Sequence, residues 1–348
     1  MGYRRKTLPL YEFRGSALKC GELYGDTQRE LIPGFLHMET PPTPERLKYA
    51  GKCWELLADW NKPVADFTRG AAKASGRSIE EHTLLMLHEE LVHTKNCTAL
   101  AVNAAAATDG NPILGQNWDW HSRLFPWPSI LHVRSDAMPE MLTYSYPGMW
   151  AAAGINEHGV SLVWTGAGYR PKVEPIVGIP TYALIAGILT CKSTGEAIEL
   201  IADTPHAGCF IFLLADARND VRVVEAMPEH AVSVRCHDVA GRANHYECEL
   251  TIKESKQTLG DSAADCGTVA RAARIHALLK HYNGIVSRAA VEAMLRDEKG
   301  EPGQTICQSP SDSRASMTVD SFYFRPVHRE MWLARGVPSE HEYVRYGL

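Results

Sequence analysis

The apolar residues of this sequence change their spacing near residue 97, and that change restricts the folds open to the chain. Before this position they recur every three or four residues, as on one face of an α-helix. Helix start signals accompany them at Thr43-Pro44 and at Ser78-Ile79-Glu80-Glu81, the second a capping box. We therefore expect residues 1–96 to be mainly helical, with residues 70–76 as a loop or frayed helix end.

Short apolar runs of strand length dominate after residue 97. The predicted strands are 98–104, 112–118, 159–164, 210–215, 221–225, 231–234, 316–324 and 330–334. The predicted helices follow Pro180 and cover about 268–282 and 287–296. Strands followed by helices and then by strands again predict an α+β fold, in which antiparallel sheets carry helices on their outer faces.

The composition is that of an ordinary globular protein, with 348 residues, 45% hydrophobic and 22% charged. A net charge of −5 argues against nucleic acid as a partner. No apolar run approaches the roughly 20 residues of a membrane-spanning helix, and residues 1–10 lack the apolar region of a secretory signal. Nine cysteines without a CxxC pair predict neither disulfides nor a zinc site. We expect a cytoplasmic protein with reduced thiols and no metal.

Cys97 stands where the polar, helical segment meets the first predicted strand. A thiol at the end of a sheet would be exposed enough to react. If the bond between Asn96 and Cys97 is cleaved, Cys97 gains an α-amine with a pKa of about 7.7–8.0, suited to take a proton from the thiol. No catalytic histidine would then be required. The alternative, more frequent for a cysteine in such a pattern, is a buried strand residue without chemistry.

Two further polar residues are candidates for the same site. Asp119 alternates with Asn117 on one face of a strand, between Trp118 and Trp120, and could orient a cation; the alternative is a turn aspartate. Asn244 carries a neutral amide donor suited to an oxyanion hole. Its alternative role is to cap a turn.

Six motifs follow one another along the chain. They are Phe13-Arg14-Gly15-Ser16 with Gly21-Glu22-Leu23-Tyr24-Gly25; Asn96-Cys97-Thr98; Gly115-Gln116-Asn117-Trp118-Asp119-Trp120; Pro147-Gly148 with Gly154-Ile155-Asn156-Glu157-His158-Gly159-Val160; Asn244-His245; and Leu295-Arg296-Asp297 with Ile306-Cys307 and Thr318-Val319. Together they resemble the acyl-coenzyme A:6-aminopenicillanic acid acyltransferase family. This family is also called isopenicillin N acyltransferase-like, or peptidase C45, and belongs to the N-terminal nucleophile hydrolases.

The resemblance implies an αββα sandwich of two antiparallel sheets flanked by helices. It also implies autocatalytic cleavage between Asn96 and Cys97. Residues 1–96 would then be a pro-segment and residues 97–348 the catalytic core, with the cleaved fragments still associated and a further homo-oligomer left open. The implied chemistry acts on amides and uses no metal or organic cofactor.

The resemblance also implies roles for single residues. Cys97 would be the nucleophile, and its amine the base. Asp119 would position that amine or assist processing, and Asn244 would stabilise the oxyanion. One departure concerns charge, because Gln308 stands where the family leads us to expect an arginine. Arg314 is the predicted replacement and substrate-binding cation.

The predicted reaction is hydrolysis of a small N-acylated amine or amino acid through an acyl-thioester on Cys97. The alternative is acyl transfer from a coenzyme A thioester or an amide to an amine, which uses the same nucleophile. A papain-like cysteine hydrolase without self-cleavage and an inactive binding module are further alternatives. Substrate contacts are predicted for the aromatic residues Trp118, Trp120, Phe125, Trp127, Trp150 and Trp164.

Overall fold

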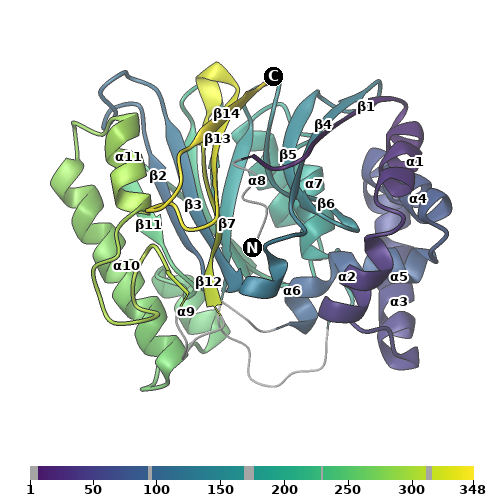
Figure 1. Ribbon diagram of the computed structural model, residues 1–348. Coiled ribbons are helices and arrows are strands. Elements are labelled where there is room, and N and C mark those ends of the chain that lie inside the picture. Colours follow the sequence, from purple (N-terminus) through teal and green to yellow (C-terminus); the bar gives the residue numbers. More distant parts are fainter. Residues whose placement is uncertain (1–6, 93–95, 168–175, 229, 311–315) are drawn as a thin grey trace.

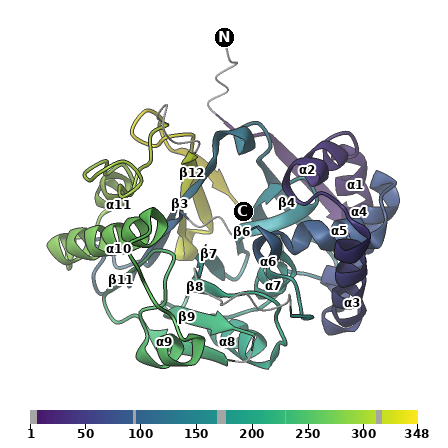
Figure 2. The same ribbon diagram turned by 90° about the horizontal axis from the view of Figure 1, so that it is seen from below.

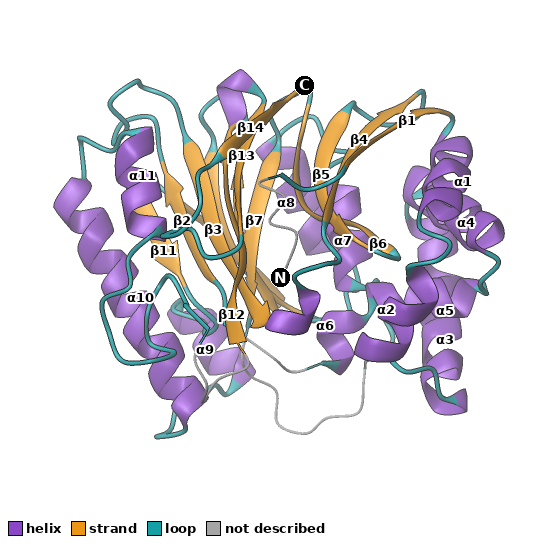
Figure 3. Ribbon diagram, in the orientation of Figure 1, coloured by secondary structure: helices purple, strands orange, loops and turns teal. Residues whose placement is uncertain are grey.

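Two β-sheets face each other in this protein, and helices cover their outer sides (Figure 1; Figure 3). The computed structural model describes residues 7–92, 96–167, 176–228, 230–310 and 316–348. The largest cluster of buried apolar side chains fills the space between the sheets and reaches under the N-terminal helices. The predicted α+β fold, a sandwich of two sheets flanked by helices, is confirmed.

The first sheet has eight strands. In spatial order they are β1 (Leu10–Gly15), β4 (Ser129–Ser135), β5 (Met141–Tyr146), β6 (Met149–Asn156), β7 (Ser161–Gly166), β8 (Phe210–Ala215), β9 (Val221–Met227) and β10 (His230–Arg235). All neighbours are antiparallel except β1 and β4, which are parallel, so this sheet is not purely antiparallel as predicted. The apolar patterns do not predict β1, β4, β5 or β6. Strand β6 is a fully buried run of mainly small apolar residues without alternation. Strand β5 is also buried on both faces, although Leu142, Thr143, Tyr144 and Ser145 alternate between apolar and polar.

The second sheet has six antiparallel strands. In spatial order they are β11 (Val239–Arg242), β2 (Thr98–Val102), β3 (Ile113–His121), β12 (Ser316–Arg325), β13 (Glu330–Arg335) and β14 (Val344–Gly347). Four of them lie within one to three residues of predicted strands. The two missed strands, β11 and β14, are the short edge strands of the sheet.

The helices form two outer layers. Those of the N-terminal segment are α1 (Ala17–Thr27), α2 (Ile32–Glu39), α3 (Pro44–Trp60), α4 (Lys62–Ser75), α5 (Ile79–Met86) and α6 (His88–Leu91). The later ones are α7 (Thr181–Ile188), α8 (Thr194–Asp203), α9 (Glu249–Ser255), α10 (Ala263–Tyr282) and α11 (Arg288–Leu295), with two short 3-10 turns at Ser122–Leu124 and Pro326–His328. Helices α10 and α11 cover the second sheet, on the side of the molecule opposite to α1–α5 (Figure 2). Among the described residues, no helix is long and apolar enough to cross a membrane.

The segment before residue 97 is mostly helical, as predicted, but it is built into the sandwich. Its strand β1 forms an edge of the first sheet by pairing with β4. The buried hydroxyl of Tyr24, on α1, donates to the carbonyl of Tyr146 and accepts from the backbone N–H of Gly148, both at 2.7 Å. These bonds connect α1 to the turn between β5 and β6.

Residues 70–76 are not the loop or frayed end predicted from their glycines. Helix α4 continues to Ser75, and Gly76, in the left-handed conformation, ends it. Gly70 lies inside the helix because α4 crosses α1 very closely, so that a Cβ at Gly70 would lie 2.2 Å from the carbonyl oxygen of Leu18. The close approach of two backbones, rather than a turn, explains this glycine.

The same crossing generates a prediction at Gly21 on α1. A Cβ there would lie 2.0 Å from the carbonyl oxygen of Phe67, so the substitution Gly21→Ala forces the helices apart and should cost about 3 kcal/mol or more. In the control Gly51→Ala, on α3, the new Cβ meets only the Cγ of Glu80 at 3.6 Å. The control should be neutral or stabilise by up to about 1 kcal/mol through helix propensity. Thermal unfolding of both variants tests this, and equal midpoints would contradict the close crossing.

Candidate active site

Four neighbouring strands of the second sheet bring the predicted site residues together (Figure 1). Their register is set by cross-strand pairs, among them Arg242 with Ala99, Thr98 with Asn117, and Asp119 with Thr318. Two residues beyond the first of these pairs, Asn244 lies opposite Cys97. Asp119, near the end of β3, lies at the same end of these strands. Residues far apart in the sequence therefore meet because of strand register alone.

The backbone nitrogen of Cys97 is held by the side chain of Asn244. The Cys97 N–H donates to Oδ1 of Asn244 at 2.8 Å. Nδ2 of Asn244 donates to the carbonyl of Gly166 at 2.9 Å, and its backbone N–H donates to Oγ1 of Thr268 at 2.7 Å. Since Oδ1 faces a donor and Nδ2 faces an acceptor, only one of the two flip orientations of the Asn244 amide satisfies both hydrogen bonds. The predicted leaving nitrogen of the cleavage thus lies against a fixed acceptor.

The carboxyl group of Asp119 is buried on the other face of β3 from its tryptophan neighbours. Thr318 Oγ1 donates to its Oδ1 at 2.6 Å, and Gln308 Nε2 donates to its Oδ2 at 3.2 Å. Burial raises the pKa of Asp119 well above its usual value, against the opposing effects of Arg271 and Thr318. A carboxyl group in this state takes up a proton more readily than an exposed aspartate does.

The sequence analysis missed Arg271, on α10, although it is part of the site. Its side chain is fully buried; Nη2 donates to Asn244 Oδ1 at 2.8 Å and Nη1 donates to the carbonyl of Gly303 at 3.2 Å. A signal for it exists in the sequence. Arg271 falls four residues before Ile275 and eight before Leu279, both buried, so it occupies the apolar face of the predicted helix.

The thiol of Cys97 is buried, not exposed at the end of the sheet as expected. The residue is 8% exposed. Burial, followed by the charge of Asp119, raises the pKa of the thiol to about 12, with a smaller contribution from Glu89; the backbone N–H of Asp119 and the charge of Arg271 act in the opposite direction. The thiol of the uncleaved chain is therefore protonated at neutral pH and needs a base before it can attack.

The predicted substrate-binding aromatic residues are dispersed. Trp118, Trp120 and Trp164 are 2–4% exposed and lie in the core between the sheets, with the rings of Trp118 and Trp164 5.5 Å apart. Trp150 stacks on Phe67 at 4.1 Å, against the N-terminal helices.

The other two aromatic residues lie in the loop after β3 and are half-buried. Phe125 packs under the guanidinium of Arg335, and Trp127 packs against Phe35. The structure therefore does not gather all six rings around one pocket. Arg314 lies outside the described residues.

A cavity of about 370 Å³ adjoins the site. Three of its lining residues contact site residues: Gln308 binds Asp119, the carbonyl of Gly303 binds Arg271, and Ser316 Oγ accepts from the Asn96 side chain at 3.4 Å. The remaining lining residues are Glu298, Gly300, Pro302, Thr305, Cys307, Ser309 and Pro310. The cavity is therefore connected to Asp119, Arg271 and Asn96 through hydrogen bonds of its lining residues.

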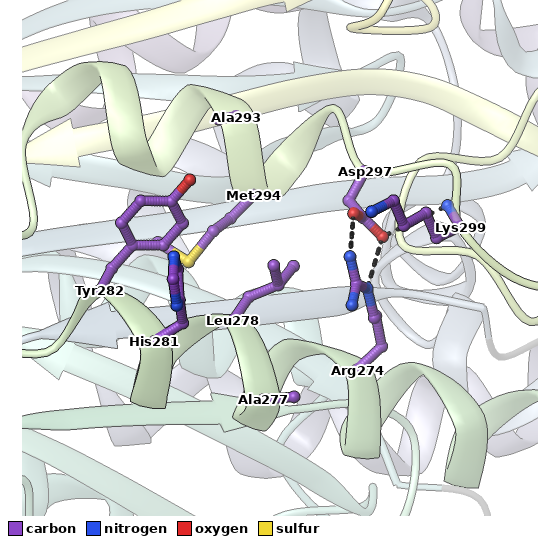
Figure 4. A pocket seen from close by; sticks show the side chains of 9 residues that line it. All are labelled: Arg274, Ala277, Leu278, His281, Tyr282, Ala293, Met294, Asp297 and Lys299. Carbon is purple, nitrogen blue, oxygen red and sulfur yellow. Dashed lines mark hydrogen bonds and ion pairs between the residues drawn. The ribbon is translucent and has the colours of Figure 1, made fainter.

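A second cavity, of about 460 Å³, lies between α10 and α11 (Figure 4). Arg274 and Asp297 form an ion pair at its edge, with a closest distance of 2.6 Å. None of the hydrogen bonds described for its lining residues reaches Cys97, Asp119 or Asn244. We therefore assign the site to the first cavity and not to this one.

Helix α6, just before the predicted cleavage position, is anchored by buried charges. Its His88 binds Glu39 of α2 at 3.0 Å, and the second oxygen of Glu39 binds His121 at the end of β3 at 2.9 Å. Burial opposes ionisation of both partners, but hydrogen bonds to the histidines lower the pKa of Glu39 to about 2, and bonds to Glu39 and Glu89 raise the pKa of His88 to about 9. On the same helix, the carboxylate of Glu89 accepts from the Tyr182 hydroxyl at 3.1 Å.

A comparison with known protein families finds a family that matches most of the chain. The family described as acyl-coenzyme A:6-aminopenicillanic acid acyl-transferase matches residues 106–340, well over half of the chain. The chain belongs to this family. The match includes Asp119, Asn244 and Arg271, and it begins after Cys97, so it does not reach the predicted nucleophile.

Solved structures of two enzymes are similar to this acyltransferase-family chain at low identity. A mutant of conjugated bile acid hydrolase from Clostridium perfringens has a TM-score of 0.46 and 14% identity, covering 72% of this chain and 97% of that chain. Penicillin V acylase from Agrobacterium tumefaciens has a TM-score of 0.45 and 12% identity, covering 69% of this chain and 83% of that chain. With TM-scores below 0.5, these similarities assign no residue of the site.

The anchoring of α6 predicts a pH-dependent effect of Glu39→Gln. Because the pKa of Glu39 is lowered, its carboxylate contributes stability that is full above about pH 4.5 and is lost as the pH falls towards 2. Because the pKa of His88 is raised, its imidazolium contributes stability that is full below about pH 6.5 and is lost as the pH rises through 9. The variant should lose about 3 kcal/mol of unfolding free energy between pH 4.5 and 6.5, and less towards pH 9. Thermal unfolding across this range measures it, with Glu55→Gln on the exposed face of α3 as control. A loss that does not vary with pH would argue against the charged pair.

Proposed function

We propose that this protein is a self-processing cysteine amidohydrolase. It cleaves its own chain between Asn96 and Cys97, and Cys97 then hydrolyses the amide bond of a small N-acylated amine or amino acid. The observation that carries the proposal is the bond between the Cys97 nitrogen and Asn244, with Asp119 and Arg271 close by. This arrangement presents one particular peptide nitrogen and one thiol to a buried acid, a fixed amide and a buried cation.

The self-cleavage proceeds by acyl shift from nitrogen to sulfur. The Cys97 thiol attacks the carbonyl carbon of Asn96, the carbon–nitrogen bond breaks, and the thiol proton passes to the released nitrogen. The ionised carboxylate of Asp119 is the base proposed to carry this proton, because its raised pKa makes it a stronger base than an exposed aspartate. Water then hydrolyses the thioester, leaving a carboxylate on Asn96 and a free α-amine and thiol on Cys97.

Turnover of substrate repeats this chemistry with the new amine as base. The neutral amine of Cys97 takes the thiol proton, the sulfur attacks the substrate carbonyl, and the amine gives the proton to the departing nitrogen. Asn244 is proposed to stabilise the oxyanion through its second Nδ2 hydrogen, since its bond to Gly166 uses only one of the two. Water then releases the acid from sulfur. Neither step calls for a metal or an organic cofactor.

Acyl transfer is the second candidate function. The cavity beside Gln308 and Ser316 supports it, because it offers space for an amine. An amine bound in that cavity could attack the thioester in place of water, and a coenzyme A thioester could donate the acyl group. The nucleophile and its partners are unchanged in this reaction. Only the competition between water and amine at the thioester distinguishes the two functions.

Two tryptophans remain the best supported substrate contacts. The indole N–H groups of Trp118 and Trp120 have no hydrogen-bond partner among the described residues, although both rings are buried. An oxygen acceptor on a bound substrate would satisfy such donors. The indole N–H of Trp150 also has no partner among these residues, but its ring stacks on Phe67 against the N-terminal helices. Trp164 donates to the carbonyl of Ala152 instead. Phe125 and Trp127 stay in the proposal as loop contacts to a substrate, and Arg314 stays in it as the predicted substrate-binding cation.

Intact-mass measurement and N-terminal sequencing test the cleavage. The wild-type protein should yield two fragments that purify together, the second beginning with Cys97. The variant Cys97→Ala should remain one chain without amidase activity, whereas Cys53→Ala, which removes a buried thiol on α3, should be cleaved and active. An uncleaved wild-type chain with full activity would contradict the N-terminal amine as base while leaving Cys97 open as nucleophile.

A panel of N-acyl amides, assayed with and without an added amine, separates hydrolysis from transfer. If hydrolysis is the function, the acid product forms at the same rate in both conditions. If the new amide accumulates at millimolar amine in water, transfer is the better description. In both cases Cys97→Ala should lose activity by about 1,000-fold or more, because it removes the nucleophile.

A further inference from the structure

A fully buried arginine on the apolar face of a helix requires an explanation. Arg271 has no exposed surface, and it shares its face of α10 with Ile275 and Leu279. Taking a guanidinium out of water costs several kcal/mol unless charges and hydrogen bonds compensate. An apolar residue at this position would pack against the sheet without that cost. The charge is therefore retained for something other than packing.

The contacts of Arg271 point to the site. One end of its guanidinium donates to Asn244 Oδ1, the same oxygen that accepts from the Cys97 nitrogen, and the other donates to the carbonyl of Gly303. Its positive charge acts on the carboxyl group of Asp119 and on the Cys97 thiol. Helix α10 also holds the Asn244 backbone through Thr268, three residues before Arg271.

We propose that Arg271 is a positioning residue of the active site, which fixes the Asn244 amide and supplies the buried positive charge opposite Asp119. The inference rests on the proposed function, because it assigns Arg271 a role in the chemistry of Cys97. It places a cation of the site on α10, where the sequence predicted one from Arg314 in place of an arginine at position 308. Gln308, which binds Asp119 without a charge, complements this arrangement.

The charge of Arg271 has a defined effect on protonation. A nearby cation disfavours the ammonium form of the Cys97 amine and favours the thiolate, so the amine is neutral, and able to act as a base, at lower pH. Removing the charge should therefore move the acidic limb of the pH–rate profile to higher pH. The other titratable groups that face this pair are Asp119 and His245 beside Arg271, and Glu89, Tyr146 and Tyr182 beside the thiol.

The test compares Arg271→Met with Arg271→Lys and with Arg274→Met. Arg274 lies one turn further along α10 and pairs with Asp297 at the other cavity (Figure 4), so its substitution should leave cleavage and pH profile unchanged. Arg271→Met should lower kcat/KM about 100-fold and raise the pH of the acidic limb by about one unit. Arg271→Lys keeps the charge but loses the paired N–H donors of the guanidinium. It should leave the acidic limb of the pH–rate profile unchanged and lower kcat about 10-fold.

A second measurement does not depend on turnover. The rate of alkylation of Cys97 by iodoacetamide, followed by peptide mass spectrometry against pH, reports the thiolate directly. Arg271→Met should slow it at each pH, and adding Gln308→Arg should restore part of the rate. An arginine at position 308 can reach Asp119, since the Gln308 amide already lies 3.2 Å from that carboxyl group.

The outcomes separate the inference from the proposed function. If Arg271→Met is folded and has the same acidic limb of the pH–rate profile and the same alkylation rate as the wild type, the inference is wrong. Cys97 can still be the nucleophile in that case. If Arg271→Met does not fold, Arg271→Lys decides, because undiminished kcat in that variant would overturn the positioning role. If Cys97→Ala retains activity, the proposed function itself is wrong.

Discussion

The hydrogen bond from the Cys97 nitrogen to Asn244 Oδ1 is the contact on which the rest of the site depends. It exists because β11 pairs with β2 in one register, and a slip of one residue would turn Asn244 to the opposite face of the sheet. Helix α10 secures the same asparagine twice, through Thr268 and through Arg271. The orientation of a single side-chain amide is thus determined by sheet register and by the packing of a helix. A change in either would first weaken the hydrogen bond of the Cys97 nitrogen, just before β2.

The N-terminal segment is held to the core by contacts that do not involve the peptide bond at residue 97. Strand β1 pairs with β4, Tyr24 bonds to the turn after β5, and Glu39 binds His88 and His121. Separating the segment would expose these buried groups and the apolar surface around them to water. Cleavage before Cys97 would leave all of these contacts in place. We therefore expect the two fragments of a processed chain to remain one folded body.

The sequence predicts the architecture well where local patterns determine it. The helical segment before residue 97, the apolar runs of β2, β3, β12 and β13, and the capping box of Ser78 and Glu81 all have local causes, and the structure has them. Strand β6 was missed because a run of small apolar residues does not distinguish a buried strand from a helix. The glycine at position 70 was misread because its reason, the backbone of α1, is distant in the sequence.

The site shows the same division. Cys97, Asp119 and Asn244 could be named from short motifs, and strand register brings them to one edge of the sheet. Arg271 could not be named by motif, since no local pattern distinguishes a buried functional arginine from one on a solvated face. Its only signal is a position on the apolar stripe of α10, and that stripe is defined by tertiary packing. The protonation state of the thiol was also out of reach, because burial of Cys97 is a property of the folded chain.

Strand β3 separates the two environments that the proposed chemistry would use. Asp119 points from one face of the strand towards β12 and the loop that carries Gln308, while Trp118 and Trp120 point from the other face into the core between the sheets. The acid and its polar partners are thereby separated from the aromatic surface by one strand thickness. Cys97 lies at the end of the neighbouring strand, where the two environments meet. In the proposed function, a nucleophile at this end of the sheet would take its electrostatic support from Asp119 and Arg271 and its substrate from the side of Trp118 and Trp120.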